Sequence, residues 1–356
     1  MTVDPSFIPA RLSMAHALKR AGRLDEAEQQ YRIVLEGHRT SVAAHRGLAI
    51  CLADMGRLDA AAEQFAWVLK LSPDDRKARA AWGSALYGSG QYQRAIDVLA
   101  VMVTGSGPPA DDLALNAIAG TGLSMAMLRR YEEALTLLQR AVAAAPQRAD
   151  LHRGLGIALY GLGQSDGAIE QLQEAVRLVP GNPALRGELA ELHAAAGGVA
   201  EASAQLARLA QIVADAPNAH QGVAIRYVRV ADLLARRDDP AAAISLLYEG
   251  LAVLPDSLEI LNDLAWRLAT GPDVALHDGA KAVELAEHAN ALAGGESCNE
   301  LDTLAAAYAR AGRFEDAVVA AEQALAIATQ AGQGGLATQI TARLELFRTG
   351  QPYTSR

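Results

Sequence analysis

Few residues of this 356-residue chain have the types and spacing that catalysis needs. One GxSxG string occurs at residues 163–167, and in hydrolases such a string holds a nucleophilic serine on a turn between a strand and a helix. Ser165 instead lies between two stretches with a helical pattern, so we expect it in a turn between helices. No GxxxxGK[ST], HExxH or EF-hand pattern occurs in the sequence. We therefore predict no catalytic residue and no enzyme activity.

The eight histidines are scattered and form no recognisable set of metal ligands. His38 with His45 and His277 with His288 come nearest to one, but neither pair is joined by cysteines or clustered carboxylates at coordinating spacing. We predict neither a metal site nor a cofactor.

Other reactive or charged residues also have structural explanations. Cys51 and Cys298 are far apart in sequence, which predicts two small buried side chains that are compatible with a reducing compartment. Paired acids such as Asp74 and Asp75 fall at turns and helix starts, where negative charge suits the helix dipole. We interpret these acids as solvated surface.

The charge and hydropathy of the chain limit its partners. The net charge is -9, and no run of lysine or arginine is long enough to follow a phosphate backbone, so we do not expect nucleic acid as a partner. The N-terminus lacks a basic start followed by an apolar run, and no stretch of 18 apolar residues occurs, so direct membrane insertion is not expected. We expect a soluble, cytoplasmic protein, or a periplasmic one if a leader was removed.

Composition and repetition predict a helical array. Alanine accounts for 76 residues, whereas aromatic residues make up only 4%. Because alanine has the highest helix propensity, the chain should be all-α. The strings GRLDEA, GRLDAA and GQYQRA begin at residues 22, 56 and 90, a period of 34. The alanine that ends this motif can be followed through nine units: Ala27, Ala61, Ala95, Ala134, Ala168, Ala202, Ala243, Ala282 and Ala317.

Two further landmarks keep the same register. An apolar residue followed by a small one precedes each alanine by twelve to eighteen residues, as Leu155-Gly156 precedes Ala168. The first residue of this pair is apolar in every unit except the fourth, where it is Thr121. A proline follows four of the alanines by twelve residues, at Pro73, Pro146, Pro180 and Pro255, where it would stop a helix.

With these landmarks the chain resembles the tetratricopeptide-repeat (TPR) family over roughly residues 8–331. The resemblance implies a right-handed superhelix, an α-solenoid of nine helix-turn-helix hairpins with a concave and a convex face. Residues 1–7 would form an N-terminal lead, residues 8–107 units one to three, and residues 108–331 units four to nine in continuity with them. Residues 332–356 would form a capping helix, with Leu336, Ile340, Leu344 and Phe347 on its apolar side, and a polar tail.

Each landmark has a physical reason. Small residues such as Gly156 and Ala168 let the two helices of a hairpin cross closely, and larger residues one turn further along, such as Leu172, should fill the core. Glycines after the first helix suit a left-handed turn residue. These glycines are Gly22, Gly56, Gly90, Gly163, Gly197 and Gly312.

Three insertions interrupt the period. The first is the loop at residues 105–109. The second, residues 208–221, is expected to extend the second helix of unit six before a turn at Pro217. The third, residues 271–278, lies inside the eighth hairpin. Each is either neutral variation in loop length or a hinge or binding loop.

The resemblance also implies a partner-binding groove. In the family's geometry, positions of the first helix near the small residue point into the concavity, and the resulting surface, largely apolar with two arginines, would suit an extended peptide or a partner helix with hydrophobic anchors and some acidic character. These positions are Arg46, Ile50, Ser84, Tyr87, Leu123, Arg153, Ile157, Tyr160 and Glu191. The Lys and Asn pair by which one subfamily recognises chaperone C-termini is not found there.

The resulting hypothesis is a non-catalytic scaffold that binds a protein or peptide in assembling a multiprotein complex. The strings LNDLAWRLAT and LELFRTGQPY resemble the ends of bacterial TPR arrays, which favours a bacterial source. A self-associating structural protein that forms homo-oligomers and an accessory subunit of a transferase or secretion system are the alternatives.

Overall fold

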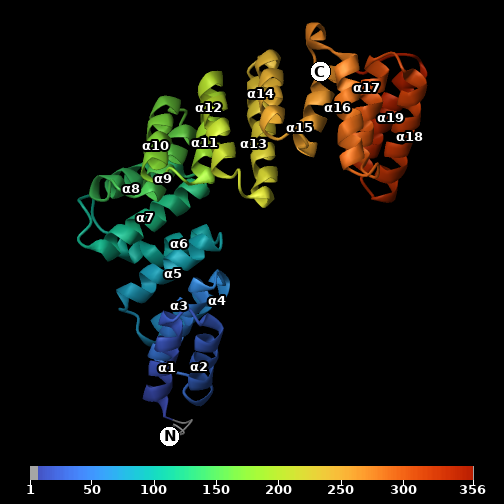
Figure 1. The fold of residues 1–356 in the computed structure, drawn as a ribbon. Coiled ribbons are helices and arrows are strands. Elements are labelled where there is room, and N and C mark those ends of the chain that lie inside the picture. Colours follow the sequence, from blue (N-terminus) through green and yellow to red (C-terminus); the bar gives the residue numbers. More distant parts are fainter. Residues whose placement is uncertain (1–6, 356) are drawn as a thin grey trace. The chain divides into compact units, whose positions relative to one another are not determined.

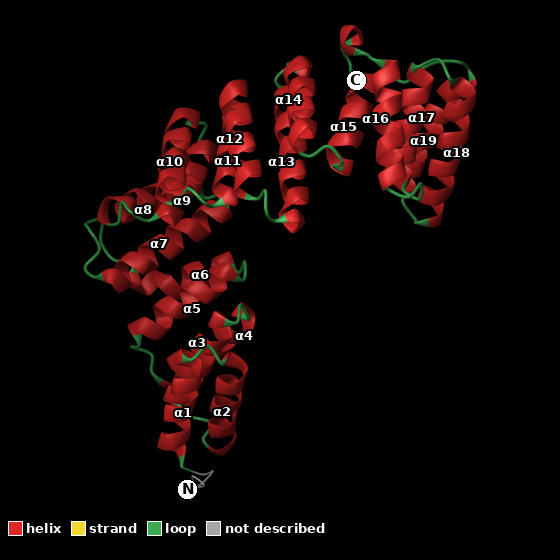
Figure 2. Cartoon of the chain, viewed as in Figure 1, coloured by secondary structure: helices red, strands yellow, loops and turns green. Residues whose placement is uncertain are grey.

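The described part of the chain, residues 7–355 of a computed structural model, is helical (Figures 1 and 2). Within it, 19 α-helices and two short 3₁₀ helices follow one another, and no strand occurs in these residues. Consecutive α-helices pair as antiparallel hairpins, from α1 with α2 to α17 with α18, and α19 remains as a single helix. The prediction of an all-α chain of nine hairpins with a C-terminal helix is confirmed. Residues 1–6 of the predicted lead lie outside the described residues.

The chain divides into two compact units, Met1–Val179 and Pro180–Arg356. The predicted partition at residue 107 stays a prediction. The helices of the first unit are α1 (Ile8–Arg20), α2 (Leu24–Gly37), α3 (Val42–Asp54), α4 (Leu58–Leu71), α5 (Arg76–Gly88), α6 (Tyr92–Leu99), η1 (Ala100–Met102), α7 (Asp112–Met127), α8 (Tyr131–Ala144), α9 (Ala149–Gly161) and α10 (Ser165–Leu178). The helices of the second unit are α11 (Pro183–Ala196), α12 (Val199–Ile212), α13 (Pro217–Arg236), α14 (Pro240–Val253), α15 (Leu258–Thr270), η2 (Val274–Leu276), α16 (Gly279–Leu292), α17 (Cys298–Arg310), α18 (Phe314–Gln330) and α19 (Gly334–Arg348).

The crossing of each hairpin is built from the predicted small residues. All nine landmark alanines are completely buried. A Cβ atom added to Gly156 would lie 3.3 Å from the carbonyl oxygen of Ala168, so α9 and α10 touch backbone to backbone at this point. Leu172, one turn beyond Ala168, is buried as predicted. Close packing of this kind leaves little room for a larger side chain.

The turn inside most hairpins uses a left-handed residue. All six predicted glycines have positive φ angles, for example 76° at Gly163. In the fourth and seventh hairpins the same place is taken by Arg129 and Asp238, with φ angles of 61° and 64°. These two residues adopt a conformation that costs a non-glycine residue free energy.

One of the predicted insertions is placed differently in the structure. The second helix of unit six, α12, has 14 residues, which is the length of most other second helices, and it is not extended. The extra residues instead lengthen the next first helix, α13, to 20 residues beginning at Pro217. Proline is well tolerated at the first position of a helix, because the amide hydrogen that it lacks would have no partner there. The expected extension of the second helix is therefore wrong.

The other two insertions are loops, as predicted. Residues 105–109 lie in the connection between η1 and α7, and residues 271–278 contain η2 between the two helices of the eighth hairpin.

The last helix closes the core of the second unit. Ile340, Leu344 and Phe347 are buried on α19, in agreement with the predicted cap. Arg343, three residues after Ile340 and four before Phe347 and so on the same side of the helix, is buried as well, at 6% exposure. Beyond α19, residues 351–355 form no regular secondary structure. No helix in the described part of the chain has both the length and the apolar character that crossing a bilayer requires.

Candidate functional site

The residues first considered for catalysis have structural roles. Gly163 and Gln164 form the turn between α9 and α10, and Ser165 is the first residue of α10, so a helix lies on each side of the GxSxG string. Both ring nitrogens of His45 lie 2.9 Å from oxygen atoms, one of the Gln64 side chain and one of the Arg39 backbone. Cys51 and Cys298 are buried free thiols, and burial raises the pKa of the Cys51 thiol.

The first helices of most successive hairpins contact one another within each unit. In the first unit α5 and α9 both contact α7, and in the second unit α11, α13, α15 and α17 contact one another in turn. The sides of these helices that face away from the second helices form one surface in each unit, which we call the first-helix surface. Binding residues on this surface are held by packed helices, so their positions are fixed before a partner arrives.

All nine predicted groove residues lie on first helices. Arg46 and Ile50 are on α3, Ser84 and Tyr87 on α5, Leu123 on α7, Arg153, Ile157 and Tyr160 on α9, and Glu191 on α11 of the second unit. Arg46, Ser84 and Tyr160 are exposed and the other six are half-buried.

The best-defined group is on α9. Arg153, Ile157 and Tyr160 follow one another at the i, i+4, i+7 spacing, which places them on one stripe of the helix. The Tyr160 side chain is 48% exposed. Leu123 of α7 joins this group, because its side chain packs over Gly154, where a Cβ atom would come within 2.3 Å of Leu123 Cδ2. The stripe thus offers an aliphatic and aromatic surface bordered by a guanidinium group.

Arg46 and Glu191 are engaged in ion pairs. Arg46 Nη2 lies 2.6 Å from the carboxylate of Asp75, which also accepts a hydrogen bond from the Ala78 amide at the start of α5. Glu191 contacts the guanidinium groups of Arg226 and Arg229 on α13. Both predicted residues therefore link neighbouring hairpins.

In the second unit such links form a series along the first helices. Glu191 of α11 pairs with Arg226 of α13, Asp232 of α13 pairs with Arg267 of α15 at 2.5 Å, and Asp302 of α17 pairs with Arg343 of α19 at 2.5 Å. In each pair the acid precedes its arginine by 35 to 41 residues, that is, by one hairpin.

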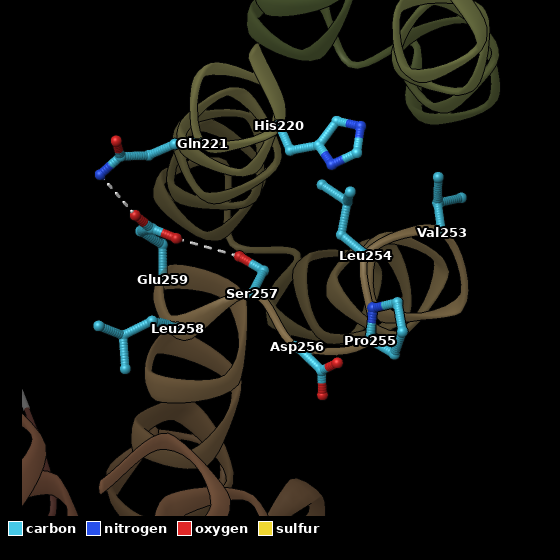
Figure 3. A pocket seen from close by; sticks show the side chains of 9 residues that line it. All are labelled: His220, Gln221, Val253, Leu254, Pro255, Asp256, Ser257, Leu258 and Glu259. Carbon is cyan, nitrogen blue, oxygen red and sulfur yellow. Dashed lines mark hydrogen bonds between the residues drawn. The ribbon is translucent and has the colours of Figure 1, made fainter. Parts of the chain in front are cut away.

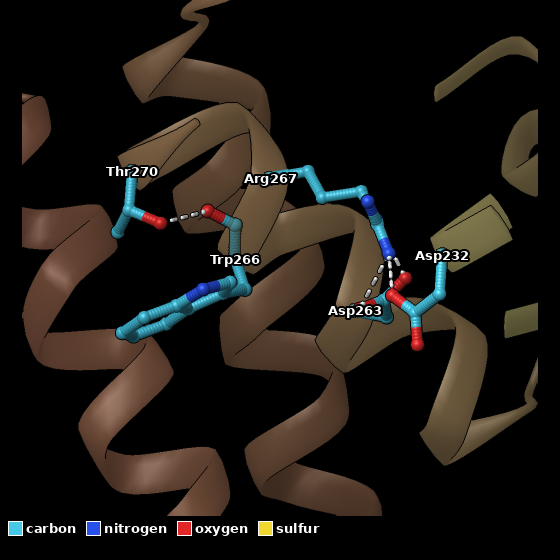
Figure 4. A network of polar contacts seen from close by, with 5 residues as sticks. All are labelled: Asp232, Asp263, Trp266, Arg267 and Thr270. Carbon is cyan, nitrogen blue, oxygen red and sulfur yellow. Dashed lines mark hydrogen bonds and ion pairs between the residues drawn. The ribbon is translucent and has the colours of Figure 1, made fainter. Parts of the chain in front are cut away.

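The middle link contains a second carboxylate, from Asp263 on α15 (Figure 4). Arg267 Nε donates to Asp263 at 2.7 Å while its Nη2 reaches Asp232. Burial alone would lower the pKa of Arg267, but the two carboxylates raise it above its ordinary value. In Figure 4 the indole of Trp266 points away from this network, on the other side of α15.

The last link is the most buried and lies beneath aromatic rings. The side chains of Arg343 and Asp302 are each 7% exposed, and two parallel hydrogen bonds of 2.9 and 2.5 Å join them. The Arg343 guanidinium lies 5.3 Å from the ring centre of Trp266 and 5.5 Å from that of Tyr353, within cation–π range. Burial raises the pKa of Asp302, and the guanidinium of Arg343 opposes that shift.

A hollow of about 530 Å³ opens beside this link on the first-helix surface of α15, α17 and α19. Its lining includes Asn262, Trp266, Asp302, Gln339 and Arg343. The Asn262 Oδ1 atom is buried and has no hydrogen-bond partner among the described residues. A hydrogen-bond donor in the hollow, such as a peptide amide, would satisfy this atom.

A second hollow, of about 460 Å³, lies where the lengthened α13 meets the loop before α15 (Figure 3). Its polar groups are largely bonded to one another, since Glu259 accepts from Gln221 at 3.0 Å and from Ser257 at 3.1 Å. Val253, Leu254, Pro255 and Leu258 are the apolar residues of its lining. This arrangement supports the α13–α15 connection, and the other carboxylate of the lining, Asp256, lies 3.2 Å from His288 Nε2.

The sequence prediction omitted Asn262, Trp266 and Asp302, although a signal was available. Trp266 follows Leu264 by two residues, as Ile50 follows Leu48 and Ile157 follows Leu155. Asp302 precedes Leu304 by two residues, as Arg46 precedes Leu48. Applying the same register to the eighth and ninth hairpins would have found them. No comparable signal places Arg310, Arg343 or Tyr353 at this surface.

Two solved structures, with TM-scores of 0.52 and 0.50, support the fold. Human IFIT1, a dimer with m7Gppp-AAAA, is similar over 90% of this chain and 72% of its own, with 16% identity and a TM-score of 0.52. The C-terminal part of a TPR protein from Cytophaga hutchinsonii is similar over 71% of this chain and 99% of its own, with 16% identity and a TM-score of 0.50. The MamA protein is similar over 48% of this chain and 91% of its own, with 20% identity and a TM-score of 0.41.

Comparison with protein families identifies the repeat. No curated protein matches the chain. One tetratricopeptide-repeat model matches residues 12–65, 52–111 and 126–183, and a second matches residues 161–224. Together the matches span residues 12–111 and 126–224, more than half of the chain. With the buried alanines, the left-handed turn residues and the paired helices, they show that this chain belongs to the tetratricopeptide-repeat family.

Proposed function

We propose that the chain is a non-catalytic scaffold that binds a partner peptide or helix on its first-helix surface during assembly of a multiprotein complex. Tetratricopeptide repeats typically mediate protein–protein interactions. The single observation that carries the proposal is the α9 stripe of Arg153, Ile157 and Tyr160, which leaves an aromatic ring 48% exposed on a rigid helix. Exposed aromatic and arginine side chains on packed elements are typical anchors of protein interfaces.

The chemistry of the surface favours a protein partner over nucleic acid. The chain carries a net charge of -9, and a nucleic-acid interface needs a concentration of basic groups against phosphates. A bacterial setting for the complex is part of the proposal and is supported by the resemblance of the C-terminal strings to bacterial arrays.

Site-specific photocrosslinking tests the proposal. A photoreactive residue in place of Tyr160, on the first helix α9, should crosslink a partner in lysate that mass spectrometry can identify. The same residue in place of Trp67, which is 44% exposed on the second helix α4, is the matched control and should not. Crosslinks at both positions, or only at Trp67, would contradict the proposal.

A double substitution then tests the contribution of the surface to affinity. Arg153→Glu with Tyr160→Ala should leave the helical circular dichroism signal intact and abolish capture of the crosslinked partner. Arg177→Glu with Trp67→Ala changes an arginine and an aromatic residue on second helices and should leave capture unchanged. Light scattering of the unmodified chain against concentration shows whether the crosslinked partner is a second copy.

A further inference from the structure

The C-terminal segment, residues 351–355, lies against the C-terminal ends of α15 and α17. The Ser355 amide and hydroxyl donate to the Thr270 carbonyl oxygen at 2.7 and 2.9 Å. Arg310 Nη2 donates to the Tyr353 carbonyl oxygen at 2.7 Å and to Thr354 Oγ1 at 2.9 Å. Two of these four bonds involve the main chain of the segment, and main-chain hydrogen bonds of this kind can hold extended peptides of varied sequence.

One side chain anchors the segment. The Tyr353 ring is half-buried, with its centre 6.0 Å from that of Trp266 and within reach of the Arg343 guanidinium. Gln351, Pro352 and Thr354 are exposed. Because the contact consists of one aromatic anchor and a few hydrogen bonds, a peptide from another molecule could make the same contacts and replace it.

Arg310 differs from the other arginines that join first helices. Arg226, Arg267 and Arg343 each face a carboxylate, whereas no described carboxylate forms an ion pair with Arg310. Its bonds go to two carbonyl oxygens, of Ala269 and Tyr353, and to the Thr354 hydroxyl, and they use only Nε and Nη2. Burial without a compensating carboxylate lowers the pKa of Arg310. A half-buried guanidinium is best satisfied by a carboxylate, which accepts two hydrogen bonds at once.

From this arrangement we infer a peptide-binding site, formed by Trp266, Arg310, Arg343 and the Thr270 carbonyl, for an extended segment in which an aromatic residue is directly followed by an acidic one. Residues 351–355 are its resident occupant, with Tyr353 as the aromatic residue and Thr354 in the acidic position. This inference rests on the proposed function and names the partner chemistry of the first-helix surface in the second unit.

A partner with this chemistry has an advantage over the resident segment. A carboxylate in place of the Thr354 hydroxyl would form with Arg310 the charge-assisted pair that no carboxylate among residues 7–355 supplies. The 530 Å³ hollow shares Trp266 and Arg343 with the resident site, so a longer peptide has room to continue there. The resident segment therefore acts as a replaceable cover.

A binding measurement tests the inference. A variant of the chain that ends at Gly350 is titrated into fluorescently labelled RTGQPYTSR, the sequence of residues 348–356, and into the same peptide with Thr354→Glu or Tyr353→Ala. We expect both peptides that retain tyrosine to bind, the Thr354→Glu peptide about tenfold more tightly because of the added ion pair. The Tyr353→Ala peptide should bind about tenfold more weakly than the unaltered one, because it lacks the aromatic anchor. The full chain should bind each peptide more weakly than the shortened one.

Arg310→Gln in the shortened chain should remove the preference for the glutamate peptide. Arg237→Gln is the matched control, since Arg237 follows α13 and donates to the Ala195 carbonyl at 2.7 Å in the corresponding way, with no segment over it. The inference is overturned if the shortened chain keeps its helical signal and binds the threonine and glutamate peptides equally, or binds neither. The inferred peptide site does not include Arg153 or Tyr160. A negative result with these peptides would therefore not decide the crosslinking test of the proposed function.

Discussion

The two units link their hairpins with ion pairs that differ in position and burial. In the first unit Arg46 pairs with Asp75 and Arg76 with Asp111, each acid being the residue that caps the next first helix, and the two arginine side chains are 46% and 49% exposed. In the second unit the acids lie within the first helices, and the exposure falls to 7% for both members of the last pair. Water screens the exposed pairs, whereas a buried charge that loses its partner is strongly destabilising.

Because of this difference, the first-helix surfaces of the two units offer different side chains to a partner. On α9 Tyr160 is exposed beside the half-buried Ile157, so hydrophobic anchoring dominates there. In the second unit most charges of the surface are paired with one another, and the aromatic site at Trp266 already holds Tyr353. The first surface is thus suited to apolar anchors, and the second to a peptide that competes with the resident segment.

The largest expected effect comes from breaking the buried link. Arg343→Met leaves the Asp302 carboxylate buried without its cation, which should cost about 3–5 kcal/mol of stability. Hydrogen exchange followed by mass spectrometry should show faster exchange in α17 and α19. The matched change in the first unit, Arg46→Met, removes an exposed pair and should cost less than about 1 kcal/mol. Equal losses at the two positions would remove the distinction between the units.

An intermediate loss of stability is expected at the hairpin crossings, which are built in the same way in both units. Ala168→Leu in α10 and Ala202→Leu in α12 place a larger side chain at a completely buried hairpin crossing. Each should lower the free energy of unfolding by about 1–3 kcal/mol through overpacking. Thermal or denaturant unfolding measures the loss, and Ala143→Leu on the exposed side of α8 is the control. If either crossing accepted leucine without loss, the assigned repeat register would be wrong in that unit.

The smallest effect concerns the two turns that lack glycine. Arg129→Gly in the first unit and Asp238→Gly in the second should each stabilise the chain by roughly 0.5–1 kcal/mol, because glycine adopts positive φ without steric cost. The reverse change at Gly163, where φ is 76°, or at Gly312, where φ is 79°, should destabilise by a similar amount. Denaturant midpoints of the four variants measure these shifts. Destabilisation by Arg129→Gly would show that its side chain contributes more than the turn strain costs.

Local features of the fold were predictable from the sequence, and so was part of the candidate surface. Ala168, Gly163 and Leu172 were assigned correctly because their roles depend on the helix period, the turn and one hairpin crossing. The placement of Arg46 and Tyr160 on first helices followed from the same register. The lengthening of α13 was not foreseen, because the extra residues suit the end of one helix and the start of the next equally well.

The sequence by itself determined the hairpin. The small residues of the helix crossing, the glycines of the turn and the prolines that stop the second helix all lie within one repeat of about 34 residues. Only the tertiary structure decided which charges meet, because Asp302 and Arg343 lie 41 residues apart on helices that approach each other through packing. It also decided that Ser355 returns to Thr270 across 85 residues. Such contacts depend on the geometry between hairpins, and no local periodicity encodes that geometry.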